Sequence, residues 1–368
     1  MRTVLAIFFL LLAAADEPHR VSQSGHRAFA PSLTPTSDGF VVAWQDTRDG
    51  HPEIYARMLD KRGQPAGPER RLTKGNDATY DADVAAIGND VAVAWYEVGS
   101  NQTPRAMLGM WARDGQRIWA KPLALPERIS RNPVIRARRQ ELFCAWLAEN
   151  AARDFEVYAA WFDHKGNPLT PALRVGPAGP TTHSVNATLD VNGDAWVVYD
   201  ARVNTRASEV FVARVTKTAS HIARVTADDG RASSSPDIAV GADRVALTWF
   251  DERAGSQDIY LFIARADDLN EGLESRAIKV NSAPGASTGA SVAWNARRRR
   301  FGLSWCDTQA RHEVHVQEFD PNGSPAEAER MPRNAADSLI PALEPAQSSE
   351  GFAVAWTDDA EVSFALIR

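Results

Sequence analysis

An apolar run that ends in an aromatic residue recurs seven times along the chain, and this repeat constrains the fold more than any other feature. The successive spacings between the aromatic residues are 51, 51, 53, 50, 56 and 51 residues. Each unit contains four short segments of strand character that are separated by turn residues. Four strands at a period of roughly 50 residues predict a β-propeller, in which closure of a ring protects the sheet edges. We therefore predict an all-β fold, a seven-bladed β-propeller of four-stranded blades. The aromatic residues are Trp44, Trp95, Trp146, Tyr199, Trp249, Trp305 and Trp356.

The four segments of a unit, here called a to d, have recognisable starts. Segment a begins with Pro or Ala two residues before an aliphatic residue, as in Pro31-Ser32-Leu33 and Ala187-Thr188-Leu189. Segment b is the apolar run, segment c opens with an acid, and segment d is short. The seventh unit ends at Arg368 after segment c, while "HRVSQSG" at 19–25 matches segment d of other units. We expect this N-terminal strand to complete the last blade and close the ring.

The first fifteen residues have the composition of a secretory signal peptide. Arg2 precedes an apolar stretch from 4 to 12, and three alanines at 13–15 provide a small-residue cleavage site. No later stretch is apolar enough to predict a transmembrane segment. Residues 16–368 are expected to form a single propeller domain. The pattern predicts an exported protein that is periplasmic or extracellular, and we expect a monomer.

Charge, cysteine and histidine content exclude several kinds of site. The formal net charge of −6 provides no basic surface for nucleic acid. Cys144 and Cys306 fall in the third and sixth units, nearly across the ring, so we expect both thiols to be free. The eight His residues lack metal-ligand spacing, and no phosphate loop or nucleophile motif occurs. We expect no metal site and no cofactor.

Two motifs carry a resemblance to known proteins. The pattern Trp-x-Asp-x-Arg-x-Gly at 44–50 and 249–255, followed by acid-Ile-Tyr, resembles repeats of exported bacterial β-propellers. A remoter similarity is to the sialidase-like propellers, whose Asp-box is Ser-x-Asp-x-Gly-x-x-Trp at the c–d turn. This chain has Asp60-x-x-Gly63 there, without the Ser or the Trp. The resemblance implies a propeller fold and, through the sialidase-like proteins, a glycoside-processing activity.

An acid follows the aromatic residue in six units, and an Arg follows this acid by two residues in three of them. One interpretation is structural, because such a carboxylate can accept backbone N–H bonds of the b–c turn and hold the Arg. The other interpretation is that the three Arg residues converge on an anionic ligand. The acids are Asp46, Glu97, Asp200, Asp251, Asp307 and Asp358, and the Arg residues are Arg48, Arg202 and Arg253.

The loops of the two faces of the ring differ in charge. The b–c loops at 45–53, 147–156 and 250–258 each carry three acids and one Arg, which predicts an acidic b–c/d–a face. On the other face the stretches "RARRQE" (136–141) and "ARRRRF" (296–301) are basic. We interpret these as solvated hairpin tips, with contact to a polyanionic surface as the alternative.

The start of segment a is expected to line the mouth of the central channel on the acidic face. Small polar groups there can bind a ligand or a cation, or can line a water-filled tunnel. The predicted mouth residues are Ala30, Asp81, Asn132, Asn186, Ser235, Gly289 and Ile340, with Asp83, Thr188, Asp237 and Ser291 farther in and Tyr80 and His183 just before them. As ligand-binding candidates we select Tyr80, Asp81, Asn132, His183, Asn186 and Asp237.

Two functions are compatible with this pattern. The first is a non-catalytic module that binds a protein or a glycan through the acidic channel face. The second is a sialidase-like or other glycoside hydrolase, with Asp81 or Asp83 as the acid or base. A hydrolase needs two carboxyl groups at about 5–10 Å separation, one with a raised pKa, and a binding module does not.

Overall fold

The structure is a computed structural model, and it describes residues 17–23, 25, 27–123, 129–177, 181–202, 207–269, 273–281, 286–308, 312–332, 338–346 and 351–368. The expected signal peptide at 1–15 lies outside these residues. Within the described part of the chain, no helix has the length and hydropathy needed to cross a membrane.

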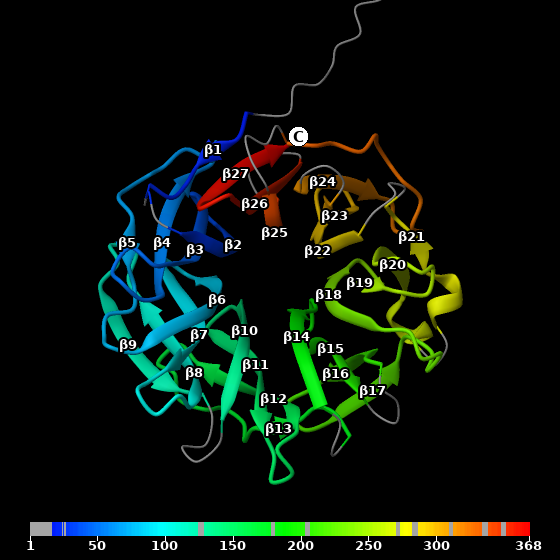
Figure 1. The fold of residues 1–368 in the computed structure, drawn as a ribbon, viewed down its shortest axis with the longest axis horizontal. Helices are drawn as coiled ribbons and strands as arrows, with labels where there is room; N and C mark the ends of the chain where they lie inside the picture. The colour runs from blue at the N-terminus through cyan, green and yellow to red at the C-terminus, as the bar shows by residue number, and fades with distance from the viewer. Residues whose placement is uncertain are drawn as a thin grey trace, which may run out of the picture.

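Seven antiparallel sheets surround a central axis, as predicted (Figure 1). Blades one to three consist of β2 (Ala28–Thr36), β3 (Gly39–Asp46), β4 (Glu53–Asp60) and β5 (Arg70–Arg71); β6 (Ala78–Ile87), β7 (Asp90–Val98), β8 (Pro104–Trp111) and β9 (Arg117–Pro122); and β10 (Ser130–Arg138), β11 (Glu141–Glu149), β12 (Phe155–Asp163) and β13 (Leu173–Arg174).

Blades four and five have the same order of four strands, and blade six has three strands. They consist of β14 (Thr181–Leu189), β15 (Ala195–Arg202), β16 (Glu209–Val215) and β17 (Ser220–Arg224); β18 (Ser233–Gly241), β19 (Arg244–Asp251), β20 (Asp258–Arg265) and β21 (Ile278–Lys279); and β22 (Ala286–Asn295), β23 (Arg300–Thr308) and β24 (His312–Phe319). Two 3₁₀ turns, η1 (Ala266–Asp268) and η2 (Leu273–Arg276), precede β21. Outside β24, blade six has two isolated bridges among the described residues, Val316 with Arg330 and Phe319 with Pro325.

The last blade joins the two ends of the chain, which confirms the predicted ring closure. It consists of β25 (Ser338–Ala346), β26 (Gly351–Asp358), β27 (Glu361–Ile367) and the N-terminal β1 (His19–Arg20). Figure 1 shows β1 beside β27. Val21 continues the contact, because its N–H donates to the carbonyl oxygen of Val362 at 2.8 Å.

The second strand of each blade is buried on both faces because neighbouring blades pack against both. In β3 all eight residues are buried, whereas the outer strand β5 is not. This explains why the sequence shows a continuous apolar run here instead of alternation. The seven repeated aromatic residues are all buried. Packing between blades is direct, as the rings of Phe40 in blade one and Phe364 in blade seven are 5.3 Å apart.

The Asp-x-x-Gly turns between the third and fourth strands also form as expected. In blade one, Oδ1 of Asp60 accepts the N–H groups of Arg62 at 2.8 Å and Gln64 at 2.9 Å. Gly63 has a φ of 79°, in the left-handed region, and a Cβ there would collide with the ring of Phe364. The turn therefore requires glycine for its backbone and for the approach of blade seven.

Candidate functional site

A β-bulge marks the channel mouth in every blade. The register between the first two strands shifts at the same place in each, for example between Phe29 and Ser32 in blade one. Five non-glycine residues at these bulges have φ between 48° and 53°. Such a conformation costs about 1–3 kcal/mol and persists only where the surroundings enforce it. The five are Ala30, Asp81, Asn132, Ser235 and Ile340.

Side chains of the preceding blade hold some of these bulges. The N–H of Ala30 donates to Oγ1 of Thr357 at 3.1 Å, and the N–H of Ser235 donates to Oδ2 of Asp200 at 3.2 Å. Asp200 also accepts the N–H groups of His183 at 3.1 Å and Ser184 at 2.8 Å. This corrects the grouping of Asp200 with the acids of the b–c corner. It follows its aromatic residue by one position instead of two, and its carboxylate binds backbone at the channel mouth.

The register also corrects the alignment of blade four. Asn186 lies opposite Val198, one residue before the aromatic Tyr199, just as Ser32 lies opposite Ala43 before Trp44. The matching segment start is therefore 185–187 and not 187–189. Asn186 consequently lies one step deeper in the channel than predicted, and Ser184 takes its place at the mouth.

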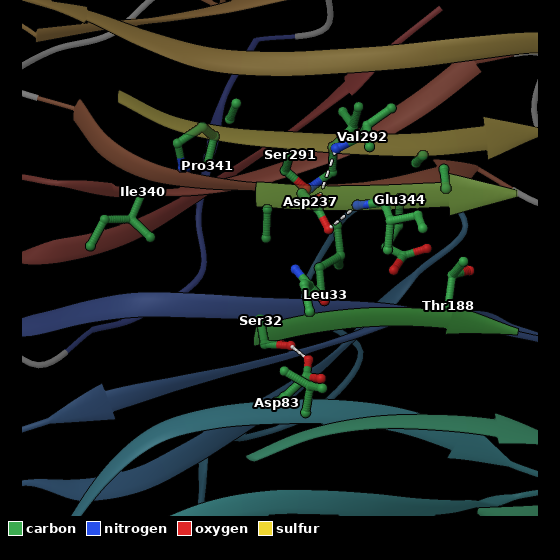
Figure 2. A pocket seen from close by; sticks show the side chains of 18 of the residues that line it. Ser32, Leu33, Asp83, Thr188, Asp237, Ser291, Val292, Ile340, Pro341 and Glu344 are labelled. Carbon is green, nitrogen blue, oxygen red and sulfur yellow. Dashed lines mark hydrogen bonds between the residues drawn. The ribbon is translucent and has the colours of Figure 1, made fainter. Parts of the chain in front are cut away.

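The mouth opens into a cavity of about 520 Å³ along the channel. The strands β2, β6, β10, β14, β18, β22 and β25 contribute its lining. Figure 2 shows polar side chains from several of these strands directed into it, among them Asp83, Thr188 and Glu344. Of the predicted residues, Asp81, Asn132, Asn186 and Asp237 line the cavity together.

Asp83 is held by hydrogen bonds from its own protein. Its Oδ1 accepts the hydroxyl of Ser32 at 2.8 Å, and its Oδ2 accepts the N–H of Ile135 at 2.8 Å. The guanidinium of Arg136 binds Oδ2 at 2.6 Å and also donates to Oδ1 of Asn186 at 2.8 Å. One charged network thus links the inner strands of blades one to four. These contacts connect neighbouring blades to one another.

The carboxylate of Asp237, on the other side of the ring, also accepts hydrogen bonds from the protein. Its Oδ1 accepts the N–H of Ile238 at 2.8 Å, and its Oδ2 accepts the N–H of Val292 in the next blade at 2.9 Å (Figure 2). Burial raises the pKa of Asp237, although these donors and Arg136 oppose the rise. The carboxylate ties blade five to blade six.

Glu344 is another carboxyl group of the channel with a raised pKa. Loss of hydration raises its pKa to about 8, with Arg136 lowering it and Asp83 and Asp237 raising it. The side chain projects from β25 toward the channel axis (Figure 2). Near neutral pH a large fraction of Glu344 is therefore protonated and can donate a hydrogen bond.

Glu344→Gln should remove a pH dependence of stability. An unfolded Glu has a pKa of about 4.3, so between this value and about 8 the folded chain binds more protons than the unfolded chain. The free energy of unfolding of the parent should therefore fall as pH rises through this window, and the Gln variant should lack this part of the fall. Denaturant unfolding at pH 5, 6.5 and 8 measures it. Glu141→Gln, at the β10–β11 hairpin, is the control. Equal slopes in parent and Glu344→Gln would contradict the shift.

Aromatic and acidic groups gather at the rim beside blades two and three. The rings of Tyr80 and Tyr96 stack at 5.2 Å, and Nδ2 of Asn132 donates to Oδ2 of Asp81 at 3.1 Å. Loss of hydration raises the pKa of Asp81, against the opposing effect of Arg131. Burial, together with Asp81 and Tyr80, raises the pKa of Tyr96 to about 12. His183 is exposed beside the rim of blade four.

Two of the three predicted arginines, Arg48 and Arg253, bind acids of their own blades. In blade one, Arg48 binds Asp46 through its backbone N–H at 2.9 Å and its guanidinium at 2.6 Å, and it also binds Glu69 at 2.6 Å. Arg253 binds Asp251 in the same way, at 2.8 and 2.5 Å. These contacts have the geometry of the structural interpretation. Arg202 is exposed at the end of β15.

Part of the acidity counted on the b–c/d–a face is internal. Asp46, Glu53, Asp251 and Asp258 are at most 2% exposed. Arg71 binds Glu53 at 2.5 Å, and Lys279 binds Asp258 at 2.8 Å. These loop acids therefore form ion pairs within the blades and contribute little negative charge to the surface.

Sequence reasoning missed Arg136 and Glu344 as channel residues. Arg136 was assigned to a basic hairpin tip, but it lies in β10 and lines the cavity. Both residues follow a channel-facing position by two, Val134 and Ala342 respectively, and strand side chains alternate with a period of two. Extending that alternation along segment a would have found them.

The remaining candidates from the sequence are the basic stretch at 296–301, the two cysteines and a metal site. Arg298 pairs with Glu318 at 3.1 Å, so part of the second stretch is neutralised. Cys144 and Cys306 are both free and buried, as predicted. Within the described part of the chain, no group of three or more His, Cys, Asp or Glu side chains has metal-binding geometry.

Comparison with known proteins supports the fold. No family model and no curated protein sequence matches the chain. A protein of unknown function from Dyadobacter fermentans has a TM-score of 0.61 at 9% identity, over 96% of this chain and 99% of that one. A subtype N10 neuraminidase-like protein of A/little yellow-shouldered bat/Guatemala/060/2010 has a TM-score of 0.51 at 7% identity, over 97% of this chain and 100% of that one.

A third similar structure is Trypanosoma rangeli sialidase in complex with the inhibitor DANA. Its TM-score is 0.51 at 9% identity, over 97% of this chain and 58% of the sialidase. At these identities the likeness is one of fold. The described chain is thus a seven-bladed β-propeller that shares its fold with sialidase-like propellers.

Proposed function

We propose that this chain is an exported, non-catalytic binding module that takes a small polar group, such as the end of a glycan, into the channel mouth. The observation that carries the proposal is the cavity of about 520 Å³. Pockets for small molecules typically span about 300–1,000 Å³ and carry a few placed polar groups. Here Asp81, Asn132 and the stacked Tyr80 provide an acceptor, an amide and an aromatic face at the rim.

The deeper carboxylates already accept hydrogen bonds from the protein, and this favours a binding function over catalysis. Asp83, a predicted acid or base of the hydrolase, and Asp237, a predicted ligand-binding residue, each accept two or more hydrogen bonds from the protein itself. An acid or base needs an oxygen that is open to substrate. Asp81 and Glu344 are less constrained, and both have raised pKa values.

Those raised values sustain one alternative, a glycoside hydrolase. A protonated carboxyl group near neutral pH is what a general acid requires. In that alternative Glu344, whose pKa is about 8, would protonate the leaving group. Because Trypanosoma rangeli sialidase has a similar fold, the panel of test substrates includes sialosides.

Asp81→Asn should weaken glycan binding at least tenfold, because it removes the rim carboxylate that accepts from ligand hydroxyls. The measurement is a glycan array with sialylated and neutral glycans, followed by titration calorimetry on the strongest binder. Asp359→Asn, an exposed acid in the b–c loop of blade seven, is the matched control. An array without any binder contradicts the proposal, as does equal affinity of the two variants.

Turnover of chromogenic glycosides is assayed in parallel. If the parent hydrolyses a glycoside and Asp81→Asn or Glu344→Gln abolishes this activity, the hydrolase is the correct function and the binding module is wrong. Binding without hydrolysis supports the module.

A further inference from the structure

The corner between blades one and two contains two adjoining cavities away from the channel. They measure about 330 and 310 Å³, and Asp77 and Glu97 line both. Gly99 and Arg105 line the first, and Trp95 lines the second. Trp95, Glu97 and Gly99 belong to blade two, whose b–c loop lacks the Trp-x-Asp-x-Arg-x-Gly motif of blades one and five.

Blades one and five show how the complete Trp-x-Asp-x-Arg motif fills this corner. In blade one, Nε1 of Trp44 donates to Asp46 at 3.1 Å, and the guanidinium of Arg48 binds the same oxygen. That guanidinium also lies 4.3 Å from the ring centre of Tyr55. Blade five repeats the set with the corresponding bonds, and its guanidinium lies 4.4 Å from the ring of Tyr260. The corner is an indole, a carboxylate and a guanidinium in contact.

Blade two keeps the first two groups and lacks the third. Trp95 is followed at two residues by Glu97 and at four by Gly99, where blades one and five have Arg. Trp95 is only 3% exposed, yet its Nε1 has no hydrogen-bond partner in the described part of the protein. A buried N–H without an acceptor is costly, by about 1–3 kcal/mol.

The direction of the missing side chain is also visible. A Cβ placed on Gly99 would lie 3.2 Å from Oδ1 of Asp77. Asp77 forms no ion pair with the described residues. A cationic group in this corner would therefore meet one unpaired carboxylate and a second on Glu97.

The remaining charges at this corner set limits on the ligand. Arg105, whose side chain is 52% exposed, already pairs with Glu97 from the solvent side. Lys74 and Arg117 line the second cavity but are themselves exposed, so water screens them. The unpaired acceptor is Asp77, and the planar cation that matches a carboxylate beside an indole is a guanidinium.

We propose that the corner of blade two binds a guanidinium group supplied by a ligand, in the place that an internal Arg occupies in blades one and five. The chemical class is an arginine side chain, presented by a peptide segment or by free arginine. On binding, Asp77 and Glu97 accept from the guanidinium, and a carboxylate drawn toward Trp95 can accept its indole N–H. The site is separate from the channel mouth and does not depend on the proposed glycan binding.

Gly99→Arg should abolish this binding, because the chain would then fill the corner with its own guanidinium. Titration calorimetry of the full chain with N-acetylarginine amide should give saturable binding that weakens as salt is raised. Gly99→Arg and Asp77→Asn should each reduce the affinity at least tenfold. Gly67→Arg adds the same charge at a position with open space around it and should bind like the parent.

Further ligands identify the group that is recognised. Free arginine distinguishes a small-molecule site, and an extended Arg-containing peptide distinguishes a peptide site. N-acetylcitrulline amide, which is uncharged but similar in shape, should bind at least tenfold more weakly. Equal binding of this analogue, absence of N-acetylarginine amide binding, or unchanged affinity in both variants would overturn the proposal.

Discussion

Trp249→Ala should lower the free energy of unfolding by about 3–5 kcal/mol, the usual cost of deleting a large core aromatic. The side chain is fully buried between blades four and five, in one cluster with Val198 and Phe262. Its indole also donates to Asp251 at 2.9 Å and stacks with Tyr260 at 6.2 Å between ring centres. The deletion thus leaves a cavity and removes a donor from a buried carboxylate.

Equilibrium unfolding in urea measures this loss, read as a change in midpoint at constant slope. Trp119→Ala is the matched control, because Trp119 lies on the outer strand β9 and is only partly buried. We expect the control to lose less than half as much stability. Equal losses would mean that the repeated aromatic residues do not carry the packing between blades.

Removal of residues 16–26 should destabilise the ring by several kcal/mol and promote association. Burial of a Val side chain contributes about 1.5–3 kcal/mol, and Val21 is completely buried. The N–H of Val362, which donates to Oγ of Ser22 at 2.8 Å, would lose its partner. The shortened chain would also leave the edge of β27 unpaired, and exposed edges pair with other chains.

The truncated chain, starting at Arg27, is compared with the chain starting at Asp16 by urea unfolding and by light scattering. Val21→Ala provides the graded control, since it keeps β1 and removes only part of the side chain. An unchanged midpoint in the truncated chain would show that closure through β1 contributes little. The expected order of stability, from highest to lowest, is the chain starting at Asp16, its Val21→Ala variant and the truncated chain.

Sequence reasoning reached the architecture because the repeat is periodic. The spacing of Trp44, Trp95 and Trp146 predicted the blade number, and the match of 19–25 with the outer segments predicted closure. Both depend on local features that each blade must repeat. Burial on both faces demands an apolar second strand in every blade, so that pattern is strong.

Blade four is where periodic reasoning made an error of register. "VNATLD" provided an Ala-x-Leu that resembled the other segment starts, and the true start at Val185 has no Pro or Ala. The aliphatic at the first position packs equally well, so composition alone does not mark the strand. Cross-strand pairing with Tyr199 decided it.

The candidate sites depended on contacts between distant residues. Asp83 and Arg136 are 53 residues apart, and Asp237 and Val292 are 55 apart, yet each pair bridges two blades. Whether a carboxylate in the channel is free to bind a ligand depends on such donors. A single sequence without its fold does not reveal them.

The sequence by itself determined the number of blades, the buried aromatic residues and the closure through the N-terminal strand, because burial and turn chemistry act within one unit and recur in all. Only the tertiary structure decided which polar groups are satisfied. It assigned Asp83 and Asp237 to bracing, placed Arg136 and Glu344 in the channel, and left Trp95 without an acceptor. The physical reason is that hydration and hydrogen-bond partners come from neighbouring blades, whose residues approach one another only when the ring closes.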